Sequence, residues 1–238
     1  MKKAIKIFAA IMVALSVLCL VACNNAPTGK AAYDTSATGE GIGIRMSVVK
    51  EEIDSMKVED FEPSDQQSDY VLIKVKDYGE IVLVLRRDVA PGTVKNFKKL
   101  VADGFYTGTV FHRVIEDFMI QGGGYTLFDG EFREQPADNI KGEFTNNGHV
   151  NNLTHVRGVI SMARVGGMND SASSQFFIVH KTNDSTRNLN EDYATFGYVL
   201  AGMDVVDAIA TCEVEGSAQS PNPVVDVIVE SITFVQPK

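Results

Sequence analysis

The feature that most constrains the fold of this chain is a series of short segments rich in β-branched and aromatic residues, separated by turns. Two amphipathic helical patterns fall among them. Many short strands with only two helices favour an antiparallel barrel with helical caps over a parallel α/β sheet. The expected class is therefore mainly β. The expected strands are residues 70–75, 81–85, 110–114, 118–121, 158–163, 175–179, 195–199 and 224–235.

The two helical patterns carry start, stop and packing signals. The first begins near Pro91, with Thr93 as a candidate cap and Gly104 as a stop. The second covers residues 203–210. The residues expected to face the core are Val94, Phe97, Leu100 and Val101 in the first helix and Met203, Val206 and Ile209 in the second.

The region ahead of the first strand is less regular. Residues 24–43 are rich in Ala, Thr, Ser, Gly and Asn without an apolar period, which indicates a flexible tether. Within 47–61, the residues Val49, Ile53 and Met56 fall at helical spacing. This short amphipathic helix either docks on the folded domain or extends the tether, and the sequence leaves both possibilities open.

The N-terminus carries an export signal. Three lysines within the first six residues precede an apolar run over 7–21, shorter than the about 20 residues of a membrane-spanning helix. The run ends in Leu-Val-Ala-Cys at 20–23, which resembles the bacterial lipobox. The resemblance implies cleavage before Cys23 and a diacylglyceryl group on its thiol. Cys19 fits less well, because Leu18 is too large for the cleavage pocket. A plain signal peptide or an uncleaved anchor is the alternative reading.

Charge and cysteine content narrow the classes of function. The formal charge of the 238 residues is −9, and removal of residues 1–22 takes away three lysines and no acid, leaving −12. Such a surface repels phosphate backbones, so no nucleic-acid partner is expected. After cleavage and lipidation only Cys212 keeps a free thiol, so no internal disulfide can form. No histidine or cysteine spacing indicates a metal, and we expect a monomer.

One block of the sequence is much more specific than these patterns. Residues 111–123 read Phe-His-Arg-Val-Ile-Glu-Asp-Phe-Met-Ile-Gln-Gly-Gly. This block closely resembles the cyclophilin motif, in which a strand presents Phe-His-Arg and, after a turn, Phe-Met-x-Gln-Gly-Gly. Further blocks at 88–97, 158–163, 174–178 and 196–199 resemble the same family and stand in the family's order.

The resemblance implies an eight-stranded antiparallel barrel capped by two α-helices, with the active groove on the outer surface. It divides the chain into a signal peptide (1–22), a lipidated cysteine with tether and possible helix (23–68), and an isomerase domain (69–238). The implied function is peptidyl-prolyl cis–trans isomerisation of proline-containing polypeptides, here at X–Pro bonds of exported proteins. No cofactor is expected, because no covalent bond is made or broken.

The physics of the reaction shows what the groove must supply. Rotation about the peptide bond has a barrier of about 18–20 kcal/mol. In the twisted transition state the prolyl nitrogen regains a lone pair, so a donor to that nitrogen stabilises the transition state and not the planar ground state. Arg113 matches the family's catalytic arginine, and its guanidinium is permanently charged. Gln121 matches the glutamine that holds this arginine and contacts the substrate backbone.

The remaining site residues also come from the resemblance. Because adjacent strand residues face opposite sides, Phe176 is expected in the core and Phe177 in the groove. The residues that match the apolar wall of the proline pocket are Phe118, Met119, Phe177 and Leu189. Ala163 and Arg164 match positions that pair with an extended substrate, and Gln175 matches a glutamine that supports the groove.

Two positions depart from the family pattern. Asn188 stands before Leu189, where many cyclophilins carry a tryptophan, and this chain has no tryptophan. Tyr193 stands where many have a histidine; its aromatic ring and hydroxyl donor should preserve substrate binding. In the family, the indole binds the cyclic peptide cyclosporin. Asn188 lacks the broad apolar face of an indole, so weak cyclosporin binding is expected.

Two other classes of function compete with an enzyme. One is a binding module that grips proline segments, and the other is a surface adhesin whose acidic domain meets host or matrix ligands; turnover is incidental in both. The presence of Arg113, Gln121 and an apolar wall favours the enzyme. A groove that only binds has no need of a donor to the prolyl lone pair.

The lipobox gives a first testable prediction. Two or more acyl chains, at about 0.8 kcal/mol per buried CH₂, anchor a protein durably to the extracytoplasmic face of a cell membrane. Cys23→Ala should abolish palmitate labelling and move the protein out of the membrane fraction, or leave it as an uncleaved precursor. Cys19→Ala is the matched control and should label normally. Palmitate labelling of the Cys23→Ala protein would contradict the assignment.

Overall fold

The computed structural model describes residues 50–238. The predicted signal peptide (1–22), Cys23, the tether (24–43) and Val49 lie outside these residues. Within the described part of the chain, no helix is both long enough and apolar enough to cross a membrane.

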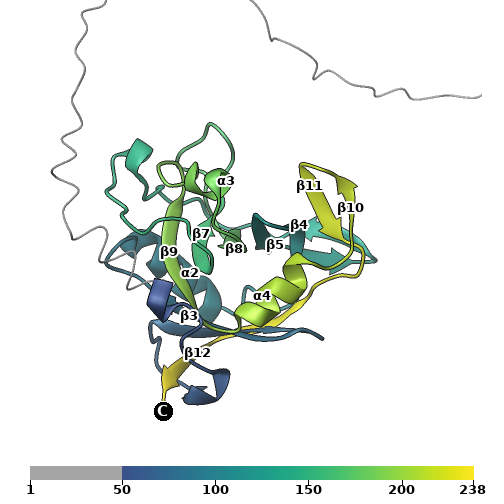
Figure 1. The fold of residues 1–238 in the computed structure, drawn as a ribbon, viewed down its shortest axis with the longest axis horizontal. Helices are drawn as coiled ribbons and strands as arrows, with labels where there is room; N and C mark the ends of the chain where they lie inside the picture. Colours follow the sequence, from purple (N-terminus) through teal and green to yellow (C-terminus); the bar gives the residue numbers. More distant parts are fainter. Residues whose placement is uncertain (1–49) are drawn as a thin grey trace, which may run out of the picture. The chain divides into compact units, whose positions relative to one another are not determined.

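A ten-stranded antiparallel sheet dominates the fold (Figure 1). Its strands are β1 (Phe61–Pro63), β2 (Tyr70–Val75), β3 (Gly79–Leu85), β4 (Thr109–Ile115), β5 (Met119–Phe128), β6 (Glu131–Glu134), β7 (Val159–Met162), β8 (Phe176–Val179), β9 (Ala194–Ala201) and β12 (Val229–Pro237). The order is β1-β12-β2-β3-β9-β7-β8-β5-β4, with β6 paired to β5. A separate hairpin consists of β10 (Val214–Ser217) and β11 (Ser220–Pro223).

The sheet closes on itself where β4 meets the residues that lead into β12. Val110 and Ile228 form an antiparallel bridge, and the Phe111 amide donates to the Val227 carbonyl at 2.9 Å. The strands from β12 through β4 therefore form a closed barrel, and closure removes the free edges of the sheet. The predicted mainly β, antiparallel class is confirmed. The strand count differs, because the short strands β1, β6, β10 and β11 were not predicted.

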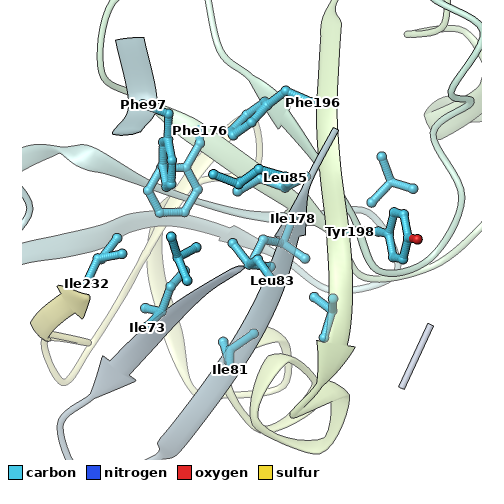
Figure 2. Close-up of a cluster of buried hydrophobic side chains, with 14 of the residues drawn as sticks. Ile73, Ile81, Leu83, Leu85, Phe97, Phe176, Ile178, Phe196, Tyr198 and Ile232 are labelled. Atoms are coloured by element: carbon cyan, nitrogen blue, oxygen red, sulfur yellow. The ribbon is translucent and has the colours of Figure 1, made fainter. Parts of the chain in front are cut away.

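The barrel interior is filled by side chains from the strands and one helix (Figure 2). Ile73, Leu83 and Ile178 project inward from three strands, and Phe97 enters from the helix α2 (Pro91–Ala102). The Phe97 ring packs 5.2 Å from the ring of Phe196, centroid to centroid. The predicted inward residues of α2 and of α4 (Met203–Ala210) are all buried. Among residues 50–238, the remaining helical elements are residues 50–52, the one-turn α3 (Asp184–Arg187), which was not predicted, and the 3-10 turns η2 (Val58–Asp60) and η3 (Thr145–Asn147).

The cap of α2 differs from the prediction. Thr93 lies inside the helix, and Ala90 is the N-cap without a side-chain bond. The cap comes instead from Glu143, whose carboxylate accepts from the amides of Gly92 at 2.9 Å and Thr93 at 2.7 Å. A carboxylate at this end also complements the helix dipole. The sequence could not reveal this cap, because a capping residue about fifty positions away in the chain leaves no local pattern.

The segment ahead of β2 packs on the barrel, but the predicted helix is short: among the described residues only 50–52 are helical, and Ile53 and Met56 lie in a turn and a bend. Ile53 and Met56 pack against the core, and the Met56 amide donates to the Leu200 carbonyl at 3.1 Å. Asp54 accepts from the Gly202 and Met203 amides at the start of α4. Packing on the barrel therefore begins ahead of residue 69, where the folded domain was predicted to start.

Candidate active site

A bulge in β4 directs Arg113 to the outer surface of the barrel. Phe111 lies opposite Gly122, yet Arg113 lies opposite Gln121, so two residues of β4 advance against one of β5. The extra residue is His112. Phe111 and Val114 both enter the core, and without the bulge Arg113 would follow Phe111 inward. Bulges often redirect side chains in this way beside functional sites.

His112 itself is packed rather than poised for proton transfer. Its ring meets the Tyr125 ring edge-on, with centroids 4.6 Å apart. Its Nδ1 atom is buried without a hydrogen-bond partner among residues 50–238. Burial lowers the pKa of His112 to about 4, because it disfavours the charged imidazole. The ring is therefore neutral at physiological pH.

A chain of hydrogen bonds holds the Arg113 guanidinium from two sides. Nη1 donates to Gln121 Oε1 at 3.2 Å, and Gln121 Nε2 donates to Gln175 Oε1 at 3.0 Å. On the other side, Nε donates to the Gln219 carbonyl at 2.9 Å, in the turn between β10 and β11. Partial burial lowers the pKa of Arg113 below its ordinary value, but an arginine stays cationic at neutral pH. The charge is thus fixed in place.

The glycines that follow Gln121 leave room for this arrangement. A Cβ on Gly124 would lie 2.3 Å from Gln175 Cγ, so only glycine lets the Gln175 side chain reach Gln121. Gly123 has φ +82°, and a Cβ there would lie 2.8 Å from the Phe176 ring. The glycine run therefore serves close packing at the site.

The predicted site residues converge on one cavity of about 240 Å³. Its lining consists of Arg113, Phe118, Met119, Gln121, Ala163, Arg164, Phe177, Leu189 and Tyr193. Gln175 lines an adjoining cavity of about 440 Å³, which shares Gln121, Ala163 and Arg164 with the first. A larger cavity of about 750 Å³ contains none of the predicted residues, so volume alone would have selected a different place.

The apolar wall of the small cavity is a cluster separate from the barrel core. Met119, Phe177 and Val179 are buried together, with Phe118 and Leu189 packed against them. Phe176 belongs to the main core instead, so the two adjacent phenylalanines face opposite sides of β8, as alternation predicts. Around Met119 and Phe177 the outer face of the barrel is thus apolar as well, and this patch can bind an apolar ring.

The comparisons with known proteins agree with this geometry. The family model described as cyclophilin type peptidyl-prolyl cis-trans isomerase/CLD matches residues 70–233. The chain belongs to this family. It is 41% identical over 163 residues to peptidyl-prolyl cis-trans isomerase B of Escherichia coli, covering 66% of this chain and 94% of that protein. A peptidyl-prolyl cis-trans isomerase of Acinetobacter baylyi is 45% identical over 135 residues, covering 56% and 67% of the two chains.

A solved structure has the same fold. It is a cyclophilin type peptidyl-prolyl cis-trans isomerase of Cryptosporidium parvum, crystallised in the presence of the dipeptide Ala-Pro. The TM-score is 0.55 at 28% identity, and the match covers 69% of this chain and 98% of that one. This cyclophilin is therefore a peptidyl-prolyl cis–trans isomerase.

Arg164 of this cyclophilin has an internal structural role that the sequence did not reveal. Its guanidinium carbon lies 5.0 Å from the centroid of the Phe144 ring and 4.9 Å from that of Tyr193. Nε donates to the Asp192 carbonyl at 2.7 Å, and only 8% of the side chain is exposed. The Arg164 side chain therefore packs on the ring of Tyr193 and supports it.

The end of α3 contributes Leu189, but not the neighbouring Asn188, to the lining of the cavity. Leu189 lines the cavity, whereas Asn188 is the exposed C-cap residue and does not line it. The position that was matched to the family's tryptophan is thus beside the pocket rather than in its wall.

His155 is a site component to which the sequence assigned no role. It is fully buried, and its ring stacks on Phe177 with centroids 5.7 Å apart and planes at 13°. Nδ1 pairs with Asn190 Oδ1 at 3.0 Å, and Nε2 pairs with the Ser161 hydroxyl at 3.0 Å. Because Asn190 Oδ1 is an acceptor, Nδ1 carries the proton and Nε2 accepts. Burial lowers the pKa of His155 to about 4.

Because His155 is buried in its neutral form, we predict that the free energy of unfolding falls in acid. The unfolded chain binds the proton near pH 6.5, whereas the folded chain binds it only near pH 4, so stability falls as pH drops through this window. Between pH 7.5 and 4.5, the free energy of unfolding of the parent should fall by about 2–3 kcal/mol more than that of His155→Gln. Denaturant titrations at both pH values measure the difference.

The control is Ser161→Ala, which removes a hydrogen bond to the ring but no titrating group. It should be less stable at both pH values and keep the parent's pH dependence. Equal acid losses in the parent and in His155→Gln would contradict the prediction.

Proposed function

We propose that this cyclophilin isomerises X–Pro bonds of exported proteins on the extracytoplasmic side of a bacterial membrane, with Arg113 as the catalytic donor. The observation that carries the catalytic assignment is the cavity in which Arg113 and Gln121 lie beside Phe118, Met119 and Phe177. An apolar wall suits the pyrrolidine ring, and a fixed cation beside it suits the nitrogen whose lone pair returns in the transition state.

The contacts of Arg113 explain how it can act without first reorganising. Within residues 50–238 its hydrogen bonds use Nε and Nη1, which leaves the Nη2 donors for a ligand. Gln121 and the Gln219 carbonyl hold the guanidinium plane from opposite sides. A donor that is already oriented does not have to reorganise as the amide twists. Gln121 supplies orientation, and Arg113 supplies the bond that forms only in the transition state.

The adjoining cavity supports a polypeptide substrate rather than an isolated proline. It continues from the proline pocket past Ala163 and Gln175. A chain that runs through both cavities would meet the groove backbone and then the apolar wall. This arrangement suits extended segments of unfolded or partly folded proteins.

The location rests on the N-terminal sequence. The basic start, the short apolar run and the lipobox-like residues 20–23 support export and lipidation of Cys23. The expected tether over residues 24–43 would link the lipid on Cys23 to the isomerase domain. In this position the enzyme would meet proteins as they emerge from the membrane.

The catalytic proposal predicts a large and specific loss on removal of the guanidinium. Arg113→Ala should lower kcat/KM for a short X–Pro peptide by at least about 100-fold, the range for loss of one preorganised donor. KM should change little, because the donor acts mainly in the twisted state. A coupled isomerisation assay measures both constants.

Arg133→Ala is the matched control. Arg133 lies on β6, exposed to solvent with its guanidinium over the Phe128 ring, and its loss should leave the rate unchanged. If Arg113→Ala were as active as the parent, the donor assignment would be wrong. Peptide binding without turnover in the parent would favour the binding module or the adhesin.

The absence of the tryptophan predicts weak inhibition by cyclosporin. Asn188 is exposed next to Leu189, so an indole placed there would add an apolar face at the rim of the pocket. Asn188→Trp should therefore tighten cyclosporin inhibition by more than it changes kcat/KM. Inhibitor titrations of parent and variant measure this. Potent inhibition of the parent, or no gain from the indole, would show that position 188 does not contact the inhibitor.

A further inference from the structure

The turn between β4 and β5 presents one wall of the proline pocket and is held from outside the pocket. Asp117 has φ 62°, in the left-handed region, and precedes Phe118, which lines the cavity. The Asp117 amide donates to His180 Nδ1 at 2.9 Å, and the His180 amide donates to the Phe118 carbonyl at 3.0 Å. The imidazole and the backbone of His180 thus bond to two successive residues of the turn.

The opposite side of the imidazole meets a fixed carboxylate. His180 Nε2 lies 3.3 Å from Asp207 Oδ1. Arg157 holds both oxygens of Asp207, at 2.5 and 2.8 Å, and also donates to the His180 carbonyl at 2.9 Å. Because Nδ1 accepts from an amide and Nε2 faces a carboxylate, the ring is neutral with its proton on Nε2. Its side chain is only 11% exposed.

The same cluster also contacts the helix that precedes Leu189, a second residue of the pocket lining. Asn183 Nδ2 donates to the Asp117 carbonyl at 2.5 Å, while Asn183 Oδ1 caps α3 by accepting from the Thr186 amide at 3.1 Å. Leu189 follows α3 and lines the same cavity as Phe118. The position of Phe118 relative to Leu189 is therefore set by contacts that converge on Asp117.

We propose that His180 is a positioning residue of the proline pocket: as a neutral acceptor it holds the Asp117 amide, and with it the Phe118 wall. The inference rests on the isomerase function and the pocket proposed above. His180 does not touch the substrate. It acts through the turn, so its loss should weaken binding of the prolyl ring more than it slows the rotation of bound substrate.

A proton on Nδ1 of His180 would remove the acceptor for the Asp117 amide. The charged groups around the ring are Asp207 and Arg157 on one side and Asp117 with Lys181 on the other. Arg157 lowers the pKa of Asp207, so this carboxylate stays ionised as the pH falls. The Asp117 carboxylate pairs with Lys181 at 2.9 Å. Protonation of the imidazole would therefore keep the Asp207 contact and break the Asp117 contact, releasing the turn.

The test compares three substitutions in the full-length protein, assayed with a short X–Pro peptide from pH 8 to pH 5. His180→Ala should raise KM about three- to tenfold, the range for one lost hydrogen bond, and leave kcat within about twofold. His180→Asn places an amide oxygen near the position of Nδ1 and does not titrate, so it should restore the parent's KM at pH 8. His149→Gln, at a histidine bonded to the Val89 carbonyl, is the control.

The pH profile separates positioning from general stability. In the parent and in His149→Gln, KM should rise in proportion to the fraction of His180 that the ¹⁵N shifts of its ring report as protonated on both nitrogens. In His180→Asn that rise should be absent. The same acid rise in His180→Asn, an unchanged KM in His180→Ala, or a ring with its proton on Nδ1 at pH 8 would each overturn the proposal. If His180→Ala does not fold, the parent and His180→Asn decide it. A parent without activity at any pH would overturn the isomerase function as well.

Discussion

The arrangement of the site depends on the extra residue in β4. An ordinary strand alternates sides, so Phe111 and Arg113 would share the interior, and a guanidinium there would face a core of aliphatic and aromatic side chains. The bulge at His112 turns Arg113 outward while Phe111 and Val114 stay in the core. Burial keeps the His112 ring neutral, at the cost of an unpartnered Nδ1 within the described residues. The bulge thus lets the same sheet fill the barrel core on its inner face and present the Arg113 cation on its outer face.

Once Arg113 faces outward, buried polar side chains determine how rigid the pocket is. His155 lies under Phe177 and His180 holds the turn that carries Phe118. Each imidazole is held as one tautomer by an acceptor on one nitrogen and a donor on the other. Buried polar groups are costly unless all of their hydrogen bonds are made, so these pairs favour a single arrangement of the wall. A pyrrolidine ring is small and makes few contacts with its pocket. A rigid wall therefore helps the pocket to bind it.

Much of this fold could be predicted because its signals are local. Periodicity located the eight barrel strands and two helices, and the cavity contains nine of the ten residues matched to the family's groove. The features that could not be predicted come from residues distant in the chain. Glu143 caps α2 from about fifty residues away, Gln219 reaches Arg113 from the β10–β11 turn, and Arg164 is enclosed by Phe144 and Tyr193. Nothing near these positions in the sequence indicates their partners.

The β10–β11 hairpin shows why a groove of this kind is better explained by catalysis than by binding alone. Its strands pair with each other, apart from the barrel sheet, yet the Gln219 carbonyl accepts the Nε proton of Arg113. A site that only gripped proline segments would be served by the apolar wall, since the ground-state prolyl nitrogen is planar and accepts no hydrogen bond. Under the proposed mechanism, a guanidinium held by Gln121 and by the hairpin is already oriented for the nitrogen when it becomes pyramidal. If Arg113 is the proposed donor, the contacts that orient it would act on the transition state, and the apolar wall would supply the affinity for the ground state.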